Sequence, residues 1–274
     1  MKKYNRIIIS AENSFISKFV RNYLENNSVD KPEHVIRYGE ETDEFPELLV
    51  IANPDCSMDE FKTILSSRKA KRVVMLSSTA IYGDITGENL NELTPMDENS
   101  THYKAENAAT ELCRLHDMEL TVLRLPQLIG GTGMGGMLIR IVSQINRGTY
   151  LHIKDSSARR SVIHAASIGQ AVADSVPGIY NIADPVAPEV RDLAEAIAFR
   201  TGQKRIYTVS LRKAIIMSKL AGLTGIGGWG KDMLAFKTES LTFSTAKAES
   251  AFGFSVPSTA TDYLRNHIYD ENSL

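Results

Sequence analysis

Two adjacent hydroxyl side chains, Ser77 and Ser78, stand where a strand is expected to end, and hydroxyls in that place can bind or orient a substrate. They follow the run from Arg72 to Leu76, which is short, apolar and rich in β-branched residues. That pattern is typical of a strand buried on both faces. Because ligands of open parallel sheets bind just beyond the carboxyl ends of the strands, both serines are candidate site residues. The alternative is that they only terminate the strand.

The residues around these serines resemble a family motif. Residues 77–84 read Ser-Ser-Thr-Ala-Ile-Tyr-Gly-Asp, which resembles the Ser-Ser-x-x-Val-Tyr-Gly motif of the extended short-chain dehydrogenase/reductases, the NAD-dependent epimerase/dehydratase family. Further segments resemble the same family in the same order along the chain. The resemblance implies an α/β fold, a Rossmann-like doubly wound parallel sheet with a small C-terminal substrate lobe.

The resemblance also implies catalytic residues, which are Ser78, Tyr103 and Asn107. A helix is predicted from about Thr101, and in the family this helix carries Tyr-x-x-x-Lys. Tyr103 matches the tyrosine, which exchanges a proton with the substrate, but Asn107 replaces the lysine that lowers the pKa of this tyrosine and holds the nicotinamide ribose. Asn107 can still hydrogen-bond a ribose, but it brings no charge.

The replacement at Asn107 leaves several interpretations open. The positive charge comes from another segment, Tyr103 acts only as a neutral donor, or the family's chemistry has been lost. Tyr103 could also be an ordinary aromatic residue at the start of a helix.

The first predicted strand and helix meet where a Rossmann domain binds the pyrophosphate of its dinucleotide. The family's loop is Gly-x-x-Gly-x-x-Gly, and its glycine positions are Ala11, Ser14 and Ser17 here, whereas the common Phe15-Ile16 pair is retained. Alanine and serine are small enough to keep helix and strand close, but the Ser14 side chain hinders approach of a phosphate to the backbone. The helix N-terminus and the Ser14 hydroxyl can still donate to that phosphate.

The resemblance implies NAD or NADP as cofactor, and these substitutions leave open whether either is bound. Arg37, at the end of the second predicted strand, weakly favours the 2′-phosphate of NADP, although it could be an exposed strand residue. Ala52 falls where the family has a small-residue turn against the cofactor. The expected cofactor contacts are Ala11, Ser14, Phe15, Ile16, Ala52 and Asn107.

The sheet is expected to lack an edge strand. The second predicted strand covers residues 34–38, and the third covers residues 48–52. Only residues 39–46 lie between the second strand and Glu47, the residue just before the third. That gap is too short for the helix-strand-helix unit that the family has there. The chain is therefore interpreted as a shortened member.

A later segment, residues 131–136, reads Gly-Thr-Gly-Met-Gly-Gly, a literal G-x-G-x-x-G. It follows a predicted strand, 120–129, and precedes a predicted helix, 137–146, so taken alone it could be a dinucleotide loop. A lone glycine fingerprint is a weak signal, and the family places a substrate-side loop at this point. We therefore assign it to the substrate side.

Substrate contacts are expected from Ser78, Thr79, Gln127 and Arg160. Gln127 lies in a segment resembling Arg-Pro-x-Asn-Val-Tyr-Gly, and Arg160 lies in one resembling Arg-x-Phe-Ile-His. Family arginines at the latter position often contact the diphosphate of a sugar nucleotide, which suits a guanidinium fork. Arg160 could equally stabilise the fold. Thr79 and Ala80 replace the Asp-Glu pair of the family's dehydratases, which disfavours dehydration, and no motif for a metal site is present.

Composition excludes several classes of protein. The chain has 274 residues, of which 43% are hydrophobic and 23% charged, as in ordinary globular proteins. A formal net charge of −2 predicts neither a nucleic-acid nor a membrane partner. Cys56 and Cys113 fit neither a disulfide scaffold nor a metal motif, which suits a reducing compartment. With no apolar segment approaching about 18 residues, we expect a cytoplasmic protein.

Two functions remain open from the sequence. The first is an NAD(P)-dependent enzyme acting on a nucleotide sugar or similar polyol; the second is a non-catalytic nucleotide- or partner-binding relative. We expect an NAD(P)-binding domain over residues 1–184, in which residues 130–159 contribute a substrate-side loop and helix, and a small lobe over residues 185–274. The family commonly dimerises through two helices, one of them the helix of Tyr103, so a homodimer is possible.

Overall fold

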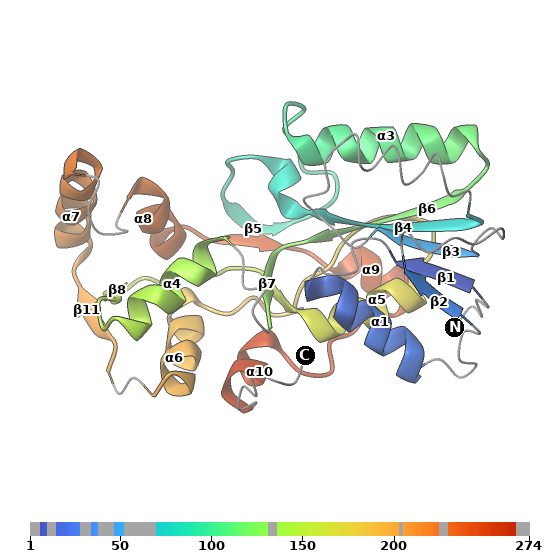
Figure 1. The fold of residues 1–274 in the computed structure, drawn as a ribbon. Helices are drawn as coiled ribbons and strands as arrows, with labels where there is room; N and C mark the ends of the chain where they lie inside the picture. The colour runs from blue at the N-terminus through green and yellow to red at the C-terminus, as the bar shows by residue number, and fades with distance from the viewer. Residues whose placement is uncertain are drawn as a thin grey trace.

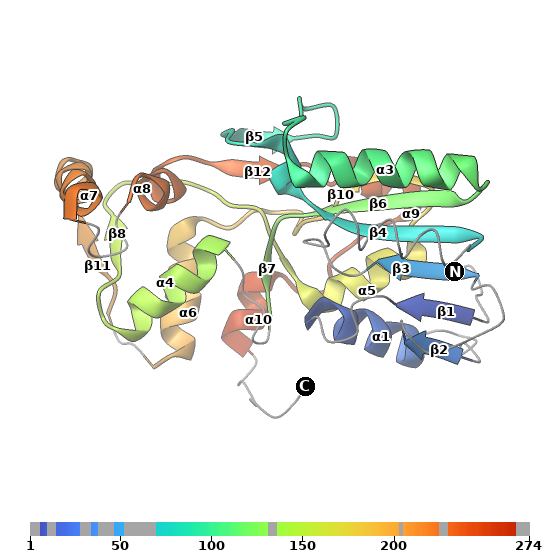
Figure 2. The same ribbon diagram turned by 45° about the horizontal axis from the view of Figure 1, so that its top comes forward.

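The centre of the molecule is a parallel sheet. A computed structural model describes residues 6–9, 15–27, 34–37, 47–51, 70–130, 136–202, 205–224 and 230–266. Within them, six strands pair in the order β10-β6-β4-β3-β1-β2 (Figures 1 and 2). Their bounds are β1 Arg6–Ile9, β2 His34–Arg37, β3 Leu48–Ile51, β4 Arg72–Ser78, β6 Glu119–Leu125 and β10 Gly178–Asn181.

Helices cover both faces of this sheet, as the doubly wound prediction requires. Helix α3 (Thr101–Leu115) lies on one face, and helices α1 (Phe15–Asn27) and α5 (Ala165–Asp174) lie on the other (Figure 1). Successive strand side chains point to opposite faces, so each face has its own hydrophobic core. The core under α3 contains Leu49, Ile51, Val73, Met75 and Val122. The core under α1 and α5 contains Leu48, Val50, Val74, Leu76 and Leu123.

The packing of α1 against α5 depends on a missing side chain. A Cβ atom placed on Gly169 of α5 would lie 2.3 Å from the Cβ of Tyr23 and 3.3 Å from the carbonyl oxygen of Phe19, both on α1. Real carbon atoms do not approach so closely, so only glycine allows the two helices their contact. This contact holds α1, whose first turn follows β1, against the sheet.

The expected loss of an edge strand is confirmed within the described residues. Strand β2 stands at the edge of the sheet, and β3 pairs directly with both β1 and β4. The chain therefore reverses its direction across the sheet between β1 and β3. Ligands of doubly wound sheets bind beside such a reversal, at the carboxyl ends of the strands.

One strand predicted from the sequence was wrong, and another was missed. The single strand predicted over 120–129 is split at Pro126: β6 ends at Leu125, and β7 (Gln127–Ile129) pairs instead with β9 (Val162–His164). Proline has no N–H to donate, so a sheet ladder is easily interrupted there. A strand that no prediction included is β5 (Gly87–Leu90), which pairs with β12 (Leu241–Phe243). Its sequence is mostly polar, and its partner lies far along the chain, so local patterns do not reveal it.

A second group of elements forms a smaller lobe beside the carboxyl edge of the sheet (Figure 1). Its core is a separate hydrophobic cluster that includes Leu138, Ile141, Leu193, Ile197 and Phe236. The elements of this lobe are α4 Gly136–Asn146, β8 Leu151–Ile153, α6 Val190–Arg200, β11 Tyr207–Val209, α7 Leu211–Thr224, α8 Lys231–Thr238 and α10 Ala260–Asn266. The remaining helix, α9 (Ala246–Phe252), packs its Ala248 on the core of the sheet instead. The domain boundary expected after residue 184 stays a prediction.

No helix in the described part of the chain is long and apolar enough to span a lipid bilayer.

Candidate functional site

The two serines at the end of β4 have different environments. Ser77 is buried and its hydroxyl donates to Oε1 of Glu106 at 2.7 Å. Ser78 is partly exposed and caps the 3₁₀ helix η1 (Thr79–Tyr82), where its Oγ accepts from the backbone N–H of Ala80 at 3.1 Å. Accepting that bond leaves the Ser78 hydroxyl proton available to a substrate oxygen. Ser77 is therefore a structural residue, whereas Ser78 keeps the predicted capacity to bind.

Tyr103 lies in the first turn of α3, against the same 3₁₀ helix that Ser78 caps. The turn is stabilised by Ser100, whose Oγ accepts from the Tyr103 N–H at 3.0 Å. The Tyr103 ring packs on a small cluster containing Ile81, Tyr82 and Phe243. Among the described residues, the Tyr103 hydroxyl has no hydrogen-bond partner. Ser78 and Tyr103 thus flank η1 at the carboxyl edge of the sheet, with hydroxyl protons that no described residue occupies.

Asn107 lies one helical turn beyond Tyr103 and is exposed on α3. The preceding residue, Glu106, faces inward and is buried. Two consecutive residues of α3 therefore belong to different environments, one open to a ligand and one closed inside the fold.

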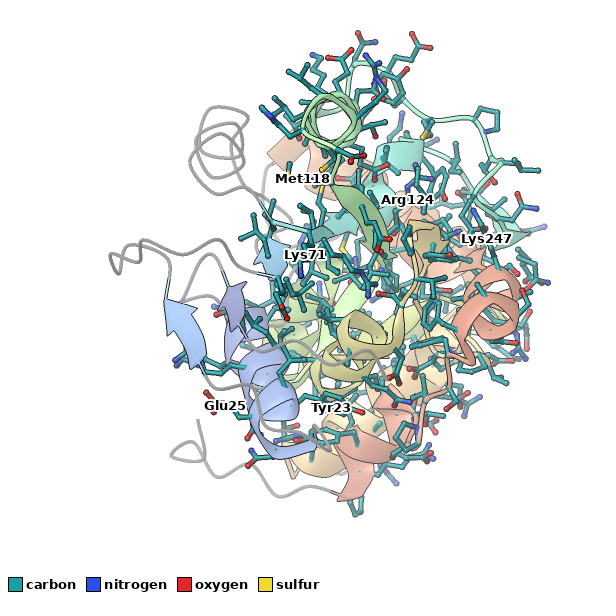
Figure 3. All side chains as sticks on the ribbon, turned by 90° about the vertical axis from the view of Figure 1, so that its right-hand side faces the viewer. Tyr23, Glu25, Lys71, Met118, Arg124 and Lys247 are labelled. Atoms are coloured by element: carbon teal, nitrogen blue, oxygen red, sulfur yellow. The ribbon has the colours of Figure 1, made fainter. Side chains whose placement is uncertain are left out.

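A buried polar network lies beneath α3. The Arg124 guanidinium binds the Glu106 carboxylate through Nη2 at 2.7 Å and Nε at 3.1 Å, and its Nη1 donates to the Tyr82 hydroxyl at 3.0 Å. The Tyr82 hydroxyl in turn donates to Oδ1 of Asn181 at 2.7 Å. Figure 3 looks at α3 end on and labels Arg124 below this helix. The network joins the helix and η1 to the sheet by paired polar groups.

The register of the sheet explains why these residues meet. Ser77 of β4 and Asn181 of β10 both pair with Arg124 of β6, on either side of it. Three polar side chains therefore stand in one row across neighbouring strands, just inside the carboxyl edge. Glu106 completes the row from above because α3 crosses the same strands.

Within the network, the pKa values of Arg124 and Tyr82 are both raised. Burial alone would lower the pKa of Arg124, but the hydrogen bonds and charge of Glu106 outweigh it and raise that pKa. Burial raises the pKa of Tyr82, and the nearby Arg124 offsets only part of this. Because the charge of Arg124 is neutralised by Glu106, Arg124 does not replace the lysine missing at position 107.

The residues expected to contact substrate lie in three places. Thr79 is partly exposed on η1, next to Ser78. Gln127 opens β7; its Oε1 is buried without a hydrogen-bond partner in the described residues, and its Nε2 lies 3.2 Å from where a Cβ on Gly136 would stand. Arg160 is buried, and its Nη2 and Nε donate at 3.0 and 3.2 Å to the carbonyl oxygens of Ala235 and Phe236 in α8. Arg160 therefore stabilises the C-terminal end of α8, and a contact with a substrate phosphate stays a prediction.

Most of the expected cofactor contacts cannot be described. Ala11, Ser14, Ala52 and the Phe15 side chain lie outside the described residues. Ile16 is buried in the core under α1, so its side chain packs rather than binds. Ser17, at the third glycine position, is only 3% exposed. Helix α1 therefore still packs closely although a hydroxymethyl group replaces a hydrogen there.

Glu106, Arg124 and Asn181 were not among the predicted site residues. A signal was present for two of them, because Arg124 and Asn181 are polar residues inside apolar strand segments, Leu-Thr-Val-Leu-Arg-Leu and Gly-Ile-Tyr-Asn. Buried polar groups require hydrogen-bond partners, so such residues indicate a network. The partners themselves could not be read from the spacing. No cluster of three or more metal-binding side chains occurs in the residues that the structure describes.

Comparison with known proteins finds a family model that matches part of the chain. Residues 58–183 match the family model described as the NAD dependent epimerase/dehydratase family. The match assigns these residues, rather than the whole chain, to that family. The match includes the β4 motif, the start of α3 and the strand of Arg124. No curated protein sequence matches the chain.

Solved structures of similar fold include several epimerases. UDP-glucose 4-epimerase from Thermotoga maritima, solved with UDP-glucose, has a TM-score of 0.66 at 16% identity, over 94% of this chain and 96% of that one. UDP-glucuronic acid 4-epimerase from Bacillus cereus, in complex with NAD, has a TM-score of 0.67 at 12% identity, over 94% of each chain. RMD from Pseudomonas aeruginosa, complexed with NADPH, has a TM-score of 0.67 at 15% identity, over 98% and 100%. At these identities the likeness establishes the fold alone.

Proposed function

We propose that this protein binds NAD or NADP and acts on a nucleotide sugar or a similar polyol, with Ser78 and Tyr103 at the reacting oxygen. The observation that carries the proposal is that both residues flank η1 at the carboxyl edge of the sheet, each with its hydroxyl proton available. Ser78 would orient the substrate hydroxyl, and Tyr103 would exchange a proton with it.

Asn107 gives this site its particular character. Its exposed amide can hydrogen-bond a ribose, as the family's lysine does, but it places no positive charge near Tyr103. Arg124 supplies none either, because it is paired with Glu106. Tyr103 would therefore act as a neutral hydrogen-bond donor that polarises the substrate oxygen, rather than as a phenolate base. This predicts a site that binds its ligands well and turns them over slowly.

One feature of helix α1 supports a dinucleotide as ligand. Helix α1 is the next described element after β1, which borders the reversal of the sheet, and no acidic side chain lies in its first turn. A helix N-terminus so placed attracts a pyrophosphate. The bound cofactor would supply a hydride acceptor or donor, while Asn107 would hold its ribose and Ser78 would orient the substrate.

Ligand binding tests this proposal directly. Thermal unfolding should shift upward with at least one of NAD+, NADH, NADP+ and NADPH at millimolar concentration, because a ligand that binds only the native state stabilises it. Asn107→Ala should lower the affinity for the dinucleotide that gives a shift by about threefold to tenfold, which corresponds to the loss of one hydrogen bond. Lys104→Ala, an exposed change on the same helix, is the matched control. No shift with any of the four would exclude the proposed enzyme.

The alternative is a non-catalytic relative that binds a nucleotide or a partner on the same fold. The uncharged Asn107 and the side chains at Ala11, Ser14 and Ser17 favour it. Asn107→Lys distinguishes the two functions in a protein that binds cofactor. If the wild type and this variant both leave UDP-glucose and UDP-glucuronic acid unchanged by product analysis, the binding function is favoured. Increased turnover in the variant would show a functional site limited by the missing charge.

A further inference from the structure

The outward side of helix α7 combines exposed aliphatic and cationic side chains. Leu211, Ile216 and Leu220 are 46%, 58% and 56% exposed. Arg212, Lys213 and Lys219 are exposed between them. We call these six residues the α7 face. Several large apolar side chains exposed on one helix indicate a candidate interaction site.

The exposed aliphatic residues are not needed for the core of their own lobe. The opposite side of α7 already packs inward, where Ala214 is fully buried with Ile153, and Met217, Val209 and Leu234 join them. Figures 1 and 2 both place α7 at the outer end of the small lobe, farthest from the sheet. Helix α7 is therefore held by its inner side and presents the α7 face outward.

The charge around this face is of one sign. From Thr201 to Gly230 the sequence contains no aspartate or glutamate, and its charged residues are Lys204, Arg205, Arg212, Lys213 and Lys219. The net charge of −2 for the whole chain, which predicted no membrane partner, averages over this segment. A binding partner responds to the local charge rather than to the sum.

These two properties select among possible occupants. A second copy of the chain would bring the same cations against each other, which is repulsive. An acidic protein would satisfy the cations but gives no reason for aliphatic side chains interleaved with them. The surface of an anionic bilayer offers phosphate groups to lysine and arginine, and acyl chains to leucine and isoleucine. We propose that the α7 face binds the surface of a lipid bilayer that contains anionic lipid. This proposal is independent of the proposed catalytic function.

Co-sedimentation with vesicles tests the proposal. The full chain should sediment with vesicles of phosphatidylcholine mixed with phosphatidylglycerol, not with phosphatidylcholine alone, and high salt should release it because the attraction is screened. Replacing Arg212, Lys213 and Lys219 together by glutamine should weaken binding more than about tenfold. Ile216→Ser combined with Leu220→Ser should also weaken it, because the aliphatic side chains insert.

A matched control uses the opposite end of the molecule. Arg114→Gln combined with Leu115→Ser removes one exposed cation and one exposed aliphatic side chain from α3, and should leave vesicle binding unchanged. Because all substituted residues are exposed, every variant is expected to fold. Thermal unfolding of each variant checks this.

Several results would overturn the proposal. The first is no sedimentation with the mixed vesicles at low salt, and the second is equal sedimentation of the glutamine variant. A third is binding that soluble polyglutamate abolishes and that the serine variant does not weaken, which would indicate an acidic protein partner. A fourth is light scattering that shows a dimer dissociated by the α7 substitutions, which would mean that a second copy covers the face.

Discussion

The polar groups buried beneath α3 and those buried in the small lobe differ in how many of their hydrogen bonds are formed. Under α3, the side chains of Ser77, Tyr82, Glu106 and Arg124 are joined by hydrogen bonds between 2.7 and 3.1 Å. In the small lobe, the Tyr150 hydroxyl and the Nδ1 of His152 are buried without hydrogen-bond partners among the described residues.

Lys237 shows the difference most clearly. It is fully buried, its Nζ donates to the carbonyl oxygen of Leu151 at 2.9 Å, and it lies over the Tyr150 ring at 4.0 Å. Burial lowers the pKa of Lys237 to about 7. Burial, together with the charges of Arg191 and Lys237, also lowers the pKa of His152. The network under α3 thus holds its cation beside a buried carboxylate and raises the pKa of that cation, whereas burial in the small lobe lowers the pKa of Lys237.

The largest loss of stability is expected when Arg124 is replaced. Arg124→Met should destabilise the protein by about 3–5 kcal/mol, because Glu106 would be left buried without its partner. Urea unfolding measures the loss. Arg191→Met is the matched control, since Arg191 forms an exposed pair with Glu195 at 2.8 Å, and a solvent-screened pair contributes far less than a buried one. Equal losses in the two variants would show that the network under α3 does not hold the fold.

The small lobe should respond to pH through Lys237. Its folded-state pKa of about 7 lies below the ordinary 10.5, so between these values the unfolded state binds more protons and stability increases as pH rises. From pH 7 to about pH 9 the gain from this residue is about 2–3 kcal/mol. Thermal unfolding of wild type and Lys237→Met over this range measures it. The variant should lack the increase, and parallel pH profiles would contradict the assignment.

A matched pair of tyrosines sharpens the comparison. Tyr82→Phe removes a hydroxyl that accepts from Arg124 and donates to Asn181, and should cost about 1–3 kcal/mol. Tyr150→Phe removes a buried hydroxyl without a partner in the described chain, and should change stability by less than about 0.5 kcal/mol or increase it. Denaturant midpoints of the two variants test this. A larger loss at Tyr150 than at Tyr82 would reverse the proposed difference between the lobes.

The smallest effect on stability is expected at Asn107. Asn107→Lys changes an exposed residue of α3 and should alter the free energy of unfolding by less than about 0.5 kcal/mol. Glu106→Gln, its neighbour in sequence, weakens the buried pair and should cost clearly more in the same urea experiment. Similar losses at both positions would mean that the candidate site and the network under α3 are not separable.

Much of the sheet could be predicted because its signals are local. The apolar run before Ser77 predicted β4, and the helix predicted from about Thr101 is α3, which begins at that residue. The short gap before Leu48 predicted the missing edge strand. The pairing of β5 with β12 could not be predicted, because a short polar strand has no periodicity and its partner comes near the end of the chain.

Prediction of the candidate site was incomplete for a related reason. Motif positions identified Ser78, Tyr103 and Asn107, and the structure places the first two against η1. The sequence left open whether Arg160 serves a substrate or the fold, and its contacts with Ala235 and Phe236 became visible only when α8 was placed beside it.

By itself the sequence determined the central strand, the start of the helix of Tyr103 and the residue types at the carboxyl edge, including the uncharged Asn107, because these are properties of neighbouring residues. Only the tertiary structure decided that Ser77, Arg124 and Asn181 form one row beneath α3. Strand register depends on how whole faces pack, so a polar residue acquires its partners only when separate segments come together. The same is true of α7, because only the tertiary structure shows that its aliphatic side chains are exposed rather than buried in a core.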